Sequence, residues 1–387
     1  MGRASATLLA IALVLAASAA RAGDTVNGRA FTEIGAYQDS VAVSVLTPSV
    51  GATVESPTAG WGANALYLVD MVSAASPDIV ATASKRWSEV RHAGNVGAKY
   101  KPGTFGVSVA GNASYTPDYL ALGASGRVTQ ELDEKNLTLT AGYGYGHDTI
   151  GRTGTPWSVF SNELDYHSFV GGLSRVVNNA LVLSGQGEVI VERGDQSKPY
   201  RFVPMFAPSV APTIAPGASV DQVANARISA RPLEQLPLAR ERYALTLRMA
   251  LRLAASTIRL DQRGYVDSWE QRATTTDFRW MFDAGRRVIW WPRLRLHAQN
   301  GASFWQRAYA ATSARDLPAL RTGDRELSPL VNATAGGGVR LALGAPGDLD
   351  GWVLTATGEG THTWFLDTIY VKDRWSALVT VGLEVGF

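Results

Sequence analysis

Charged side chains alternate with large apolar ones in the middle of this 387-residue chain. The stretch RYALTLRMALRL, which starts at Arg242, sets Arg248 and Arg252 between leucines and a methionine. Arginines can bind anions or form ion pairs together only if the fold collects them on one surface. A β-strand does this at a period of two, because successive side chains point to opposite faces. The pattern therefore predicts strands with one charged and one apolar face.

Neighbouring stretches show the same pattern, with carboxylates interleaved among the arginines. We expect one inner wall to carry Glu188, Glu192, Arg242, Arg248, Arg252, Arg259, Asp261, Arg263, Asp267, Asp277, Arg279, Asp283, Arg293 and Arg295. Such a wall can select solutes by charge in a pore. It can equally be a ladder of cross-strand ion pairs that fills a small lumen, each pair contributing about 0.2–1 kcal/mol. The sequence leaves both alternatives open.

A different group of residues could do covalent chemistry. DYHSF (residues 165–169) places a carboxylate, a histidine and a serine close together, as a hydrolase site requires in space. On a strand, however, His167 and Ser168 point to opposite faces and cannot form a nucleophile–base pair. The five histidines show no metal-binding spacing, and cysteine is absent. We therefore expect no enzyme activity, no metal and no cofactor.

The elements that carry these residues follow a strand period from about residue 34 onward. We expect strands near 34–46, 59–72, 86–100, 104–115, 119–132, 136–147, 160–177, 180–192, 242–254, 256–268, 275–284, 293–307, 327–343, 351–365 and 374–387. Short turns alternate with longer links, which is typical of outer-membrane barrels. Lipid offers backbone groups no hydrogen bonds, so the strands must close on themselves. The predicted fold class is all-β, a transmembrane antiparallel up-and-down β-barrel of about 14 to 16 strands.

The number of strands depends on the start of the chain. The pattern marks fifteen stretches, whereas bacterial single-chain barrels have an even number of strands. Either 34–46 lies outside the wall and the barrel has fourteen strands, or residues 24–33 hide another strand and the barrel has sixteen. Residues 23–387 otherwise read as one domain.

The long Pro-rich segment 194–241 cannot be a central strand, because it contains PMFAPSVAPTIAPG and proline cannot donate to a strand ladder. The segment could fold inward as a constriction of the pore, or it could form a mobile surface loop. Tyr200 and Arg201 are candidate anchors on the rim.

Both ends of the sequence carry targeting patterns. Residues 1–22 read as a secretory signal peptide, with Arg3 before the apolar run LLAIALVLAA and cleavage after Ala22. The closing stretch LVTVGLEVGF resembles the signal that barrel-assembly machinery recognises, and its apolar face consists of Val379, Val381, Leu383, Val385 and Phe387. We expect export through the periplasm to the bacterial outer membrane, with membrane lipid and that machinery as partners. A net charge of +2 gives no reason to expect nucleic acid.

Several segments resemble a family of bacterial proteins known as domain of unknown function 3570, which are predicted outer-membrane barrels. The likeness lies in YLVDMVSAASP (67–77), YTPDYLALGASGRVTQELDEKNLTLTAGYGYGHDTI (115–150), KPYRFVPM (198–205) and RYALTLRMALRLAASTIRLDQRGYVDSWE (242–270). Lys198 stands where the family usually has asparagine. The resemblance implies a barrel but no mechanism, because the family has no established activity.

These patterns predict an integral outer-membrane barrel that acts as a passive porin-like channel for small hydrophilic solutes. One alternative is a surface structural or interaction protein whose lumen is closed by side chains. A third is an outer-membrane hydrolase.

Overall fold

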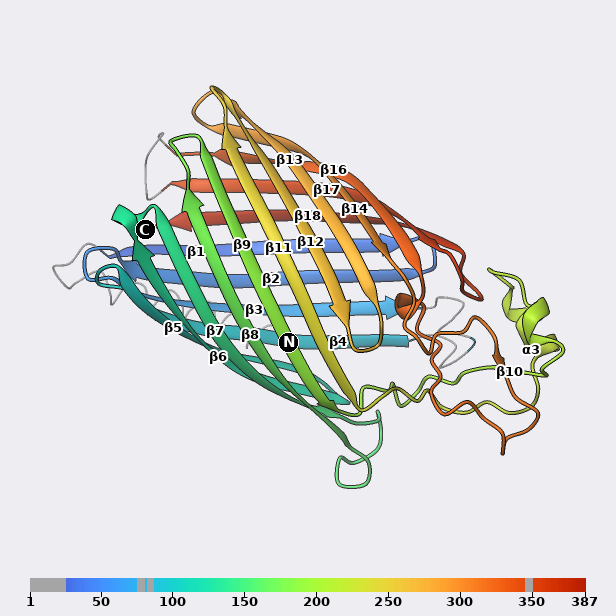
Figure 1. Ribbon diagram of the computed structural model, residues 1–387. Coiled ribbons are helices and arrows are strands. Elements are labelled where there is room, and N and C mark those ends of the chain that lie inside the picture. Colours follow the sequence, from blue (N-terminus) through green and yellow to red (C-terminus); the bar gives the residue numbers. More distant parts are fainter. Residues whose placement is uncertain (1–25, 75–80, 82–86, 345–350) are drawn as a thin grey trace.

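Sixteen antiparallel strands close into a barrel in the computed structural model (Figure 1). The structure describes residues 26–74, 81, 87–344 and 351–387, so the predicted signal peptide lies outside the described residues. The wall consists of β1 (Asn27–Asp39), β2 (Val43–Ser56), β3 (Trp61–Ala74), β4 (Trp87–Tyr100), β5 (Phe105–Thr116), β6 (Tyr119–Leu132), β7 (Leu137–Ile150), β8 (Asn162–Val176), β9 (Leu181–Gly194), β11 (Ala239–Arg252), β12 (Ser256–Asp267), β13 (Arg272–Ala284), β14 (Val288–Gln299), β16 (Leu330–Ala342), β17 (Trp352–Phe365) and β18 (Asp373–Gly386). Each strand pairs with its neighbours along the chain, and β1 pairs with β18 to close the ring.

The seam between β1 and β18 involves the last residue of the sequence. The backbone N–H and C=O of Phe387 both bond to Gly28, at 2.9 and 2.8 Å. Phe387 thus extends the pairing of β1 with β18 by one residue at the end of the barrel away from the long loops.

The sixteen-strand alternative is confirmed. The predicted stretch 34–46 spans two strands, because β1 ends at Asp39 and β2 begins at Val43. The Asp39 carboxylate holds the turn between them by accepting hydrogen bonds from the backbone N–H groups of Val41 (3.0 Å) and Val43 (2.8 Å). Ala42 takes a positive φ of 62° there. Neither glycine nor proline marks this turn, so the pattern did not reveal it.

The predicted strand 293–307 is wrong at both ends. The strand is β14, which begins five residues earlier and includes Pro292 opposite Gly337 of β16. Residues from 300 onward leave the wall, and Ala302 is buried against Leu236 and Trp269 instead. Their alternating pattern comes from packing in a loop and not from a membrane strand.

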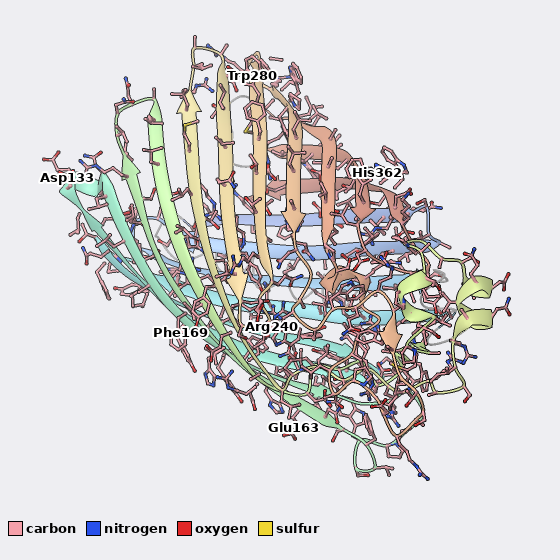
Figure 2. All side chains as sticks on the ribbon, turned by 45° about the vertical axis from the view of Figure 1, so that its right-hand side comes forward. Asp133, Glu163, Phe169, Arg240, Trp280 and His362 are labelled. Carbon is pink, nitrogen blue, oxygen red and sulfur yellow. The ribbon has the colours of Figure 1, made fainter. Side chains whose placement is uncertain are left out.

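The wall has an apolar outer face and a charged inner face. Leu245, Leu247, Leu294 and Leu296 are more than half exposed and share their side of the wall with Phe169, which projects outward in Figure 2. No protein packs on these side chains within the described chain, so lipid is their natural neighbour. Among the described residues, no helix is long and apolar enough to cross a membrane.

Three segments beyond one end of the wall fold together, and we call them the cap: residues 195–238, 300–329 and 366–372. They contain the two-residue parallel pair β10 (Met205–Phe206) and β15 (Tyr309–Ala310), helix α3 (Val220–Ala226), and the 3₁₀ helices η2 (Ala211–Thr213) and η3 (Arg325–Leu327). Figure 1 shows α3 and β10 well beyond the strand ends, opposite the carboxyl terminus. A further 3₁₀ helix, η1 (Asp133–Lys135), forms a turn at the other end of the barrel.

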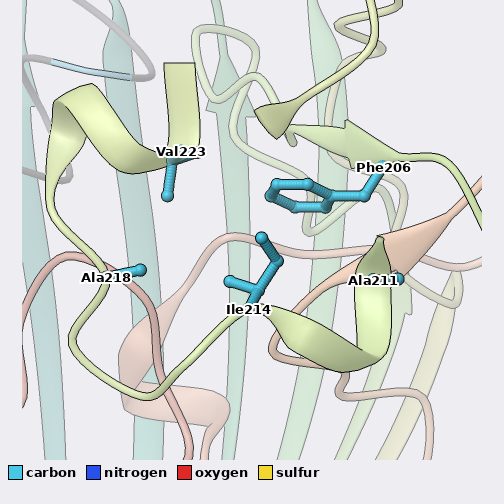
Figure 3. Close-up of a cluster of buried hydrophobic side chains, with 5 residues drawn as sticks. All are labelled: Phe206, Ala211, Ile214, Ala218 and Val223. Atoms are coloured by element: carbon cyan, nitrogen blue, oxygen red, sulfur yellow. The ribbon is translucent and has the colours of Figure 1, made fainter. Parts of the chain in front are cut away.

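The cap has its own apolar core. Phe206, Ala211, Ile214, Ala218 and Val223 pack together in Figure 3, and Phe206 is 0% exposed. Side chains of the other two cap segments, Ala308 and Ile369, pack against this cluster. The Pro-rich segment is therefore a folded unit with buried side chains, and neither a strand of the wall nor a loose loop.

Candidate functional site: the inner wall and its cap

The cap reaches across the mouth of the barrel. Its longest segment leaves the wall between β9 and β11. On one side, Gly217 and Ala218 form backbone hydrogen bonds with Thr368 and Tyr370 in the link between β17 and β18; four strands lie between β11 and β17 around the ring. On the other side, the Arg231 guanidinium donates to the carbonyl of Ala81, in the link between β3 and β4. A segment tied to three sectors of one rim must span the opening between them.

Tyr200 ties the cap to a further point on the rim, the turn between β5 and β6, as the sequence suggested for this position. Its hydroxyl donates to Oδ2 of Asp118, in the tight turn between β5 and β6, at 2.6 Å. Thr153, from the link between β7 and β8, also bonds to Asp118, at 2.8 Å. Burial favours a higher pKa for Asp118, but the hydrogen bonds from Tyr200 and Thr153 outweigh it and lower the pKa. The carboxylate is thus held ionised as the acceptor of both anchors.

Arg201 joins two cap segments through carboxylates. Its guanidinium lies 3.1 Å from Oε1 of Glu234 and 2.8 Å from Oδ2 of Asp324. The Glu234 side chain is fully buried and also accepts from the hydroxyl of Thr322 at 2.5 Å. Burial would lower the pKa of Arg201, but Asp324 and Glu234 outweigh burial and raise it. The cluster holds the 195–238 and 300–329 segments together.

All of the charged residues predicted for the inner wall lie on one face. Successive strands align them in register, as in Arg248 opposite Asp261 and Asp261 opposite Asp277. Their side chains form cross-strand ion pairs between Arg242 and Glu192 (2.9 Å), Arg263 and Glu188 (3.1 Å), Arg252 and Asp283 (2.5 Å), and Arg248 and Asp261 (3.6 Å). Ion pairing and solvent contact occur together on this wall.

The middle of the inner wall is open to solvent. The Arg248 and Asp261 side chains are 50% and 45% exposed although their strands close into a barrel. A sixteen-strand barrel is wide enough to leave an aqueous channel, whereas eight strands are filled by side chains. These exposures indicate unfilled space in the lumen beside β11 and β12.

Two of the predicted lining residues have little or no solvent exposure. The Asp267 side chain is 0% exposed, and that of Glu192 is only 9% exposed. Both lie near the strand ends where the cap meets the wall. For these two carboxylates the expected lining role is replaced by a structural one, because Asp267 pairs with Arg240 and Glu192 pairs with Arg242.

The wall across the lumen carries fewer charged residues. The strand order places β3 and β4 half a ring away from β12 and β13. Their inner face carries Asn95, which lies directly opposite Asn112 of β5, and nearer the cap the ion pair of Arg91 and Asp70. The lumen is therefore asymmetric, with an arginine-rich side facing a side that has fewer charges.

Some inner-wall residues escaped the sequence prediction. Arg240, Arg340 and Glu359 share the charged face, and Glu359 pairs with Arg293. The period-two signal was present for two of them: Arg240 continues the spacing of two from Arg242, and Glu359 lies in an alternating strand. Glu359 was overlooked because glycines flank it in the sequence.

The outer face explains the DYHSF stretch. Nδ1 of His167 lies 2.8 Å from the hydroxyl of Tyr143 on β7, and Asp165 accepts from Tyr145 at 2.6 Å. Ser168 is the next residue of β8 and points to the inner face. In the part of the chain that the structure describes, no group of three or more histidine and carboxylate side chains could hold a metal ion. These tyrosine and histidine side chains form a polar cluster on the outer face of β7 and β8.

Together, the closed antiparallel wall, the exposed apolar outer face and the charged inner face define an integral outer-membrane β-barrel. The chain belongs to the family described as "Protein of unknown function (DUF3570)", whose model matches residues 73–350. This confirms the resemblance seen in the sequence. No curated protein sequence matches the chain.

Solved barrels share the general shape at very low sequence identity. CdiB from Acinetobacter baumannii is 9% identical with a TM-score of 0.46, covering 94% of this chain and 60% of that one. A bacterial polysaccharide outer-membrane secretin is 7% identical with a TM-score of 0.49, covering 95% and 99%. OccAB2 from Acinetobacter baumannii is 11% identical with a TM-score of 0.38, covering 94% and 98%. The chain thus spans about 60% of the length of CdiB, and similarities at this level say nothing about its function.

Proposed function

We propose that the protein is a porin-like channel of the bacterial outer membrane, through which small hydrophilic solutes pass beneath a folded cap. The observation that supports this most is the exposure of Arg248 and Asp261, charged side chains at the middle of a closed wall. A side-chain-filled barrel would bury such groups or exclude them. Transport would be passive, with no covalent step and no cofactor, and selection would come from the width and charge of the lumen.

The cap would set which solutes reach the lumen. It crosses the mouth and is tied to the rim at Asp118 and Ala81, and its 366–372 segment joins β17 to β18, so solutes must pass around or through it. Wide barrels become size-selective when loops narrow them. We therefore place the size limit at the cap and the charge preference at the arginine-rich wall.

Delivery to the membrane is part of the same proposal. An exported precursor would lose residues 1–22, and barrel-assembly machinery would recognise β18 with its apolar face and Phe387. The backbone pairing of Phe387 with Gly28, at the seam between β1 and β18, supports this part of the proposal.

The second candidate is a surface barrel without transport, whose cap binds another molecule. The partly buried Arg201–Glu234–Asp324 cluster favours it, since a rigid cap makes a good interaction platform. Liposome swelling separates the two candidates. Vesicles that contain the folded barrel should swell in small sugars and not in oligosaccharides, whereas the absence of swelling in every solute would favour the surface barrel.

A further inference from the structure

We propose that a row of arginines on the inner wall forms a binding station for small oxyanions such as carboxylates or phosphate. The proposal rests on the channel function and names the solute class that its lumen holds. Arg259 of β12 lies directly opposite Arg279 of β13, and Arg279 lies directly opposite Arg293 of β14. Like charges that face each other across strands are destabilising, so this row needs nearby negative charge.

The protein supplies only part of that negative charge. Asp277 accepts from Arg279 at 3.3 Å and from Arg293 at 3.0 Å, so one carboxylate serves two guanidinium groups. Glu359 pairs with Arg293 from the other side. Within the described chain, no carboxylate lies within ion-pair distance of Arg259.

Arg295 adds a second uncompensated cation beside the row. It lies opposite Asp277 in register, but both oxygens of Asp277 already bond to Arg279 and Arg293. Among the described residues, Arg295 likewise has no carboxylate partner. The cluster therefore carries more positive than negative charge, and the excess lies on Arg259 and Arg295.

These two arginines are accessible to solutes. Arg259 and Arg295 are both exposed on the lumen side, and Arg279 is 40% exposed. A guanidinium group is planar and presents paired donors that match the oxygens of a carboxylate or phosphate. The amides of Asn95 and Asn112 on the facing wall add no competing charge. An oxyanion in the lumen would thus supply the negative charge that Arg259 and Arg295 lack.

The station predicts selectivity by chemistry as well as by charge sign. Phosphate and succinate present several oxygens to the two free arginines, whereas chloride presents a single centre. At equal ionic strength, oxyanions should therefore bind more tightly than chloride. A simple electrostatic bias of the lumen would not distinguish them.

Equilibrium dialysis of radiolabelled inorganic phosphate against the purified full-length barrel in detergent tests this station. At an ionic strength of about 0.15 M, where charges beyond about 8 Å are screened, we expect saturable binding that succinate displaces and equimolar chloride does not. The variants Arg259→Gln and Arg295→Gln should each weaken binding at least about tenfold, because each removes a charged donor. Neither change leaves a carboxylate without its partner, so the folded, heat-modifiable form on electrophoresis should persist.

Arg340→Gln is the matched control, since Arg340 is an exposed inner-wall arginine on β16 outside the row. It should change phosphate binding less than about twofold if the row forms a local site. Equal weakening by Arg259→Gln and Arg340→Gln, or no saturable binding, would overturn the station. Neutral sugar uptake in the swelling assay reports on the channel separately. Uptake of sugars without phosphate binding would support the channel and contradict the station. Phosphate binding without uptake would support the station and contradict the channel.

Discussion

Arg240 and Asp267 form a buried ion pair where the wall meets the cap. Nη2 of Arg240 lies 2.5 Å from Oδ2 of Asp267, and the two side chains are 9% and 0% exposed. Asp267 also accepts from the hydroxyl of Tyr265 and from two backbone N–H groups that follow it in the chain. The Arg240 guanidinium stacks over the ring of Trp269, at 4.1 Å from its centroid. Trp269 in turn packs on Leu236 of the cap, so the pair connects the strands to the cap.

Replacing Asp267 should therefore be costly. Asp267→Asn leaves the buried Arg240 charge uncompensated, which typically destabilises a fold by about 3–5 kcal/mol. The control is Asp261→Asn, on the same strand, whose half-exposed pair with Arg248 should contribute no more than about 1 kcal/mol. Urea unfolding in lipid vesicles, followed by tryptophan fluorescence, measures both. Similar losses in the two variants would show that burial does not set the strength of these pairs.

The core of the cap should be separable from the wall. Phe206→Ala removes a fully buried ring, at a typical cost of about 3–5 kcal/mol. We expect the cap to become sensitive to limited proteolysis while the barrel keeps its heat-modifiable mobility. Phe202→Ala in the same segment is the control, because Phe202 is 37% exposed and should leave the cap protected. Loss of the barrel itself in Phe206→Ala would contradict separate packing of cap and wall.

The cap should loosen in acid. Burial would raise the pKa of Asp324, but the charge and hydrogen bonds of Arg201 outweigh it and hold that pKa below its usual range. When the pKa of a carboxylate is lower in the folded state than in the unfolded state, the carboxylate stabilises the fold fully above the unfolded-state pKa of about 3.9. This stabilisation is lost as the pH falls through the lower folded-state pKa. The protection factors of the cap amides, which are corrected for the intrinsic pH dependence of hydrogen exchange, should therefore be constant from neutral pH to about pH 4 and fall below it.

Asp324→Asn provides the comparison for this prediction. The variant should exchange faster at neutral pH and show a smaller change on acidification, because the titrating partner of Arg201 is gone. An identical acid response in the wild type and the variant would show that protonation of a group other than Asp324 loosens the cap.

The wall was predictable because every membrane strand must turn apolar side chains to lipid and alternate them with side chains that face the lumen. From Arg242 to Asp283 the period of two assigns each side chain to a face, and closure follows from the need to pair every backbone group. The break between β1 and β2 was missed, because Ser40, Val41 and Ala42 include neither glycine nor proline and the turn is held by the side chain of Asp39 at the end of β1.

The cap was beyond prediction for a different reason. Phe206 packs with Ala308 and Ile369, which are more than 100 residues away along the chain, and none of the three lies in a periodic pattern. The row of Arg259, Arg279 and Arg293 was equally hidden. The sequence shows that these arginines belong to the inner wall. Which of them face each other depends on the strand register, and turn geometry sets that register.

Planar-bilayer recording is the most direct measurement of the proposed channel. Purified wild-type barrel should give discrete current steps, with a reversal potential in a potassium phosphate gradient that shows preference for the anion. Phe206→Ala should give larger steps, since its cap no longer holds a fixed position across the mouth. Folded protein that gives no open-channel current in either form would contradict the account and leave the barrel as a surface structure.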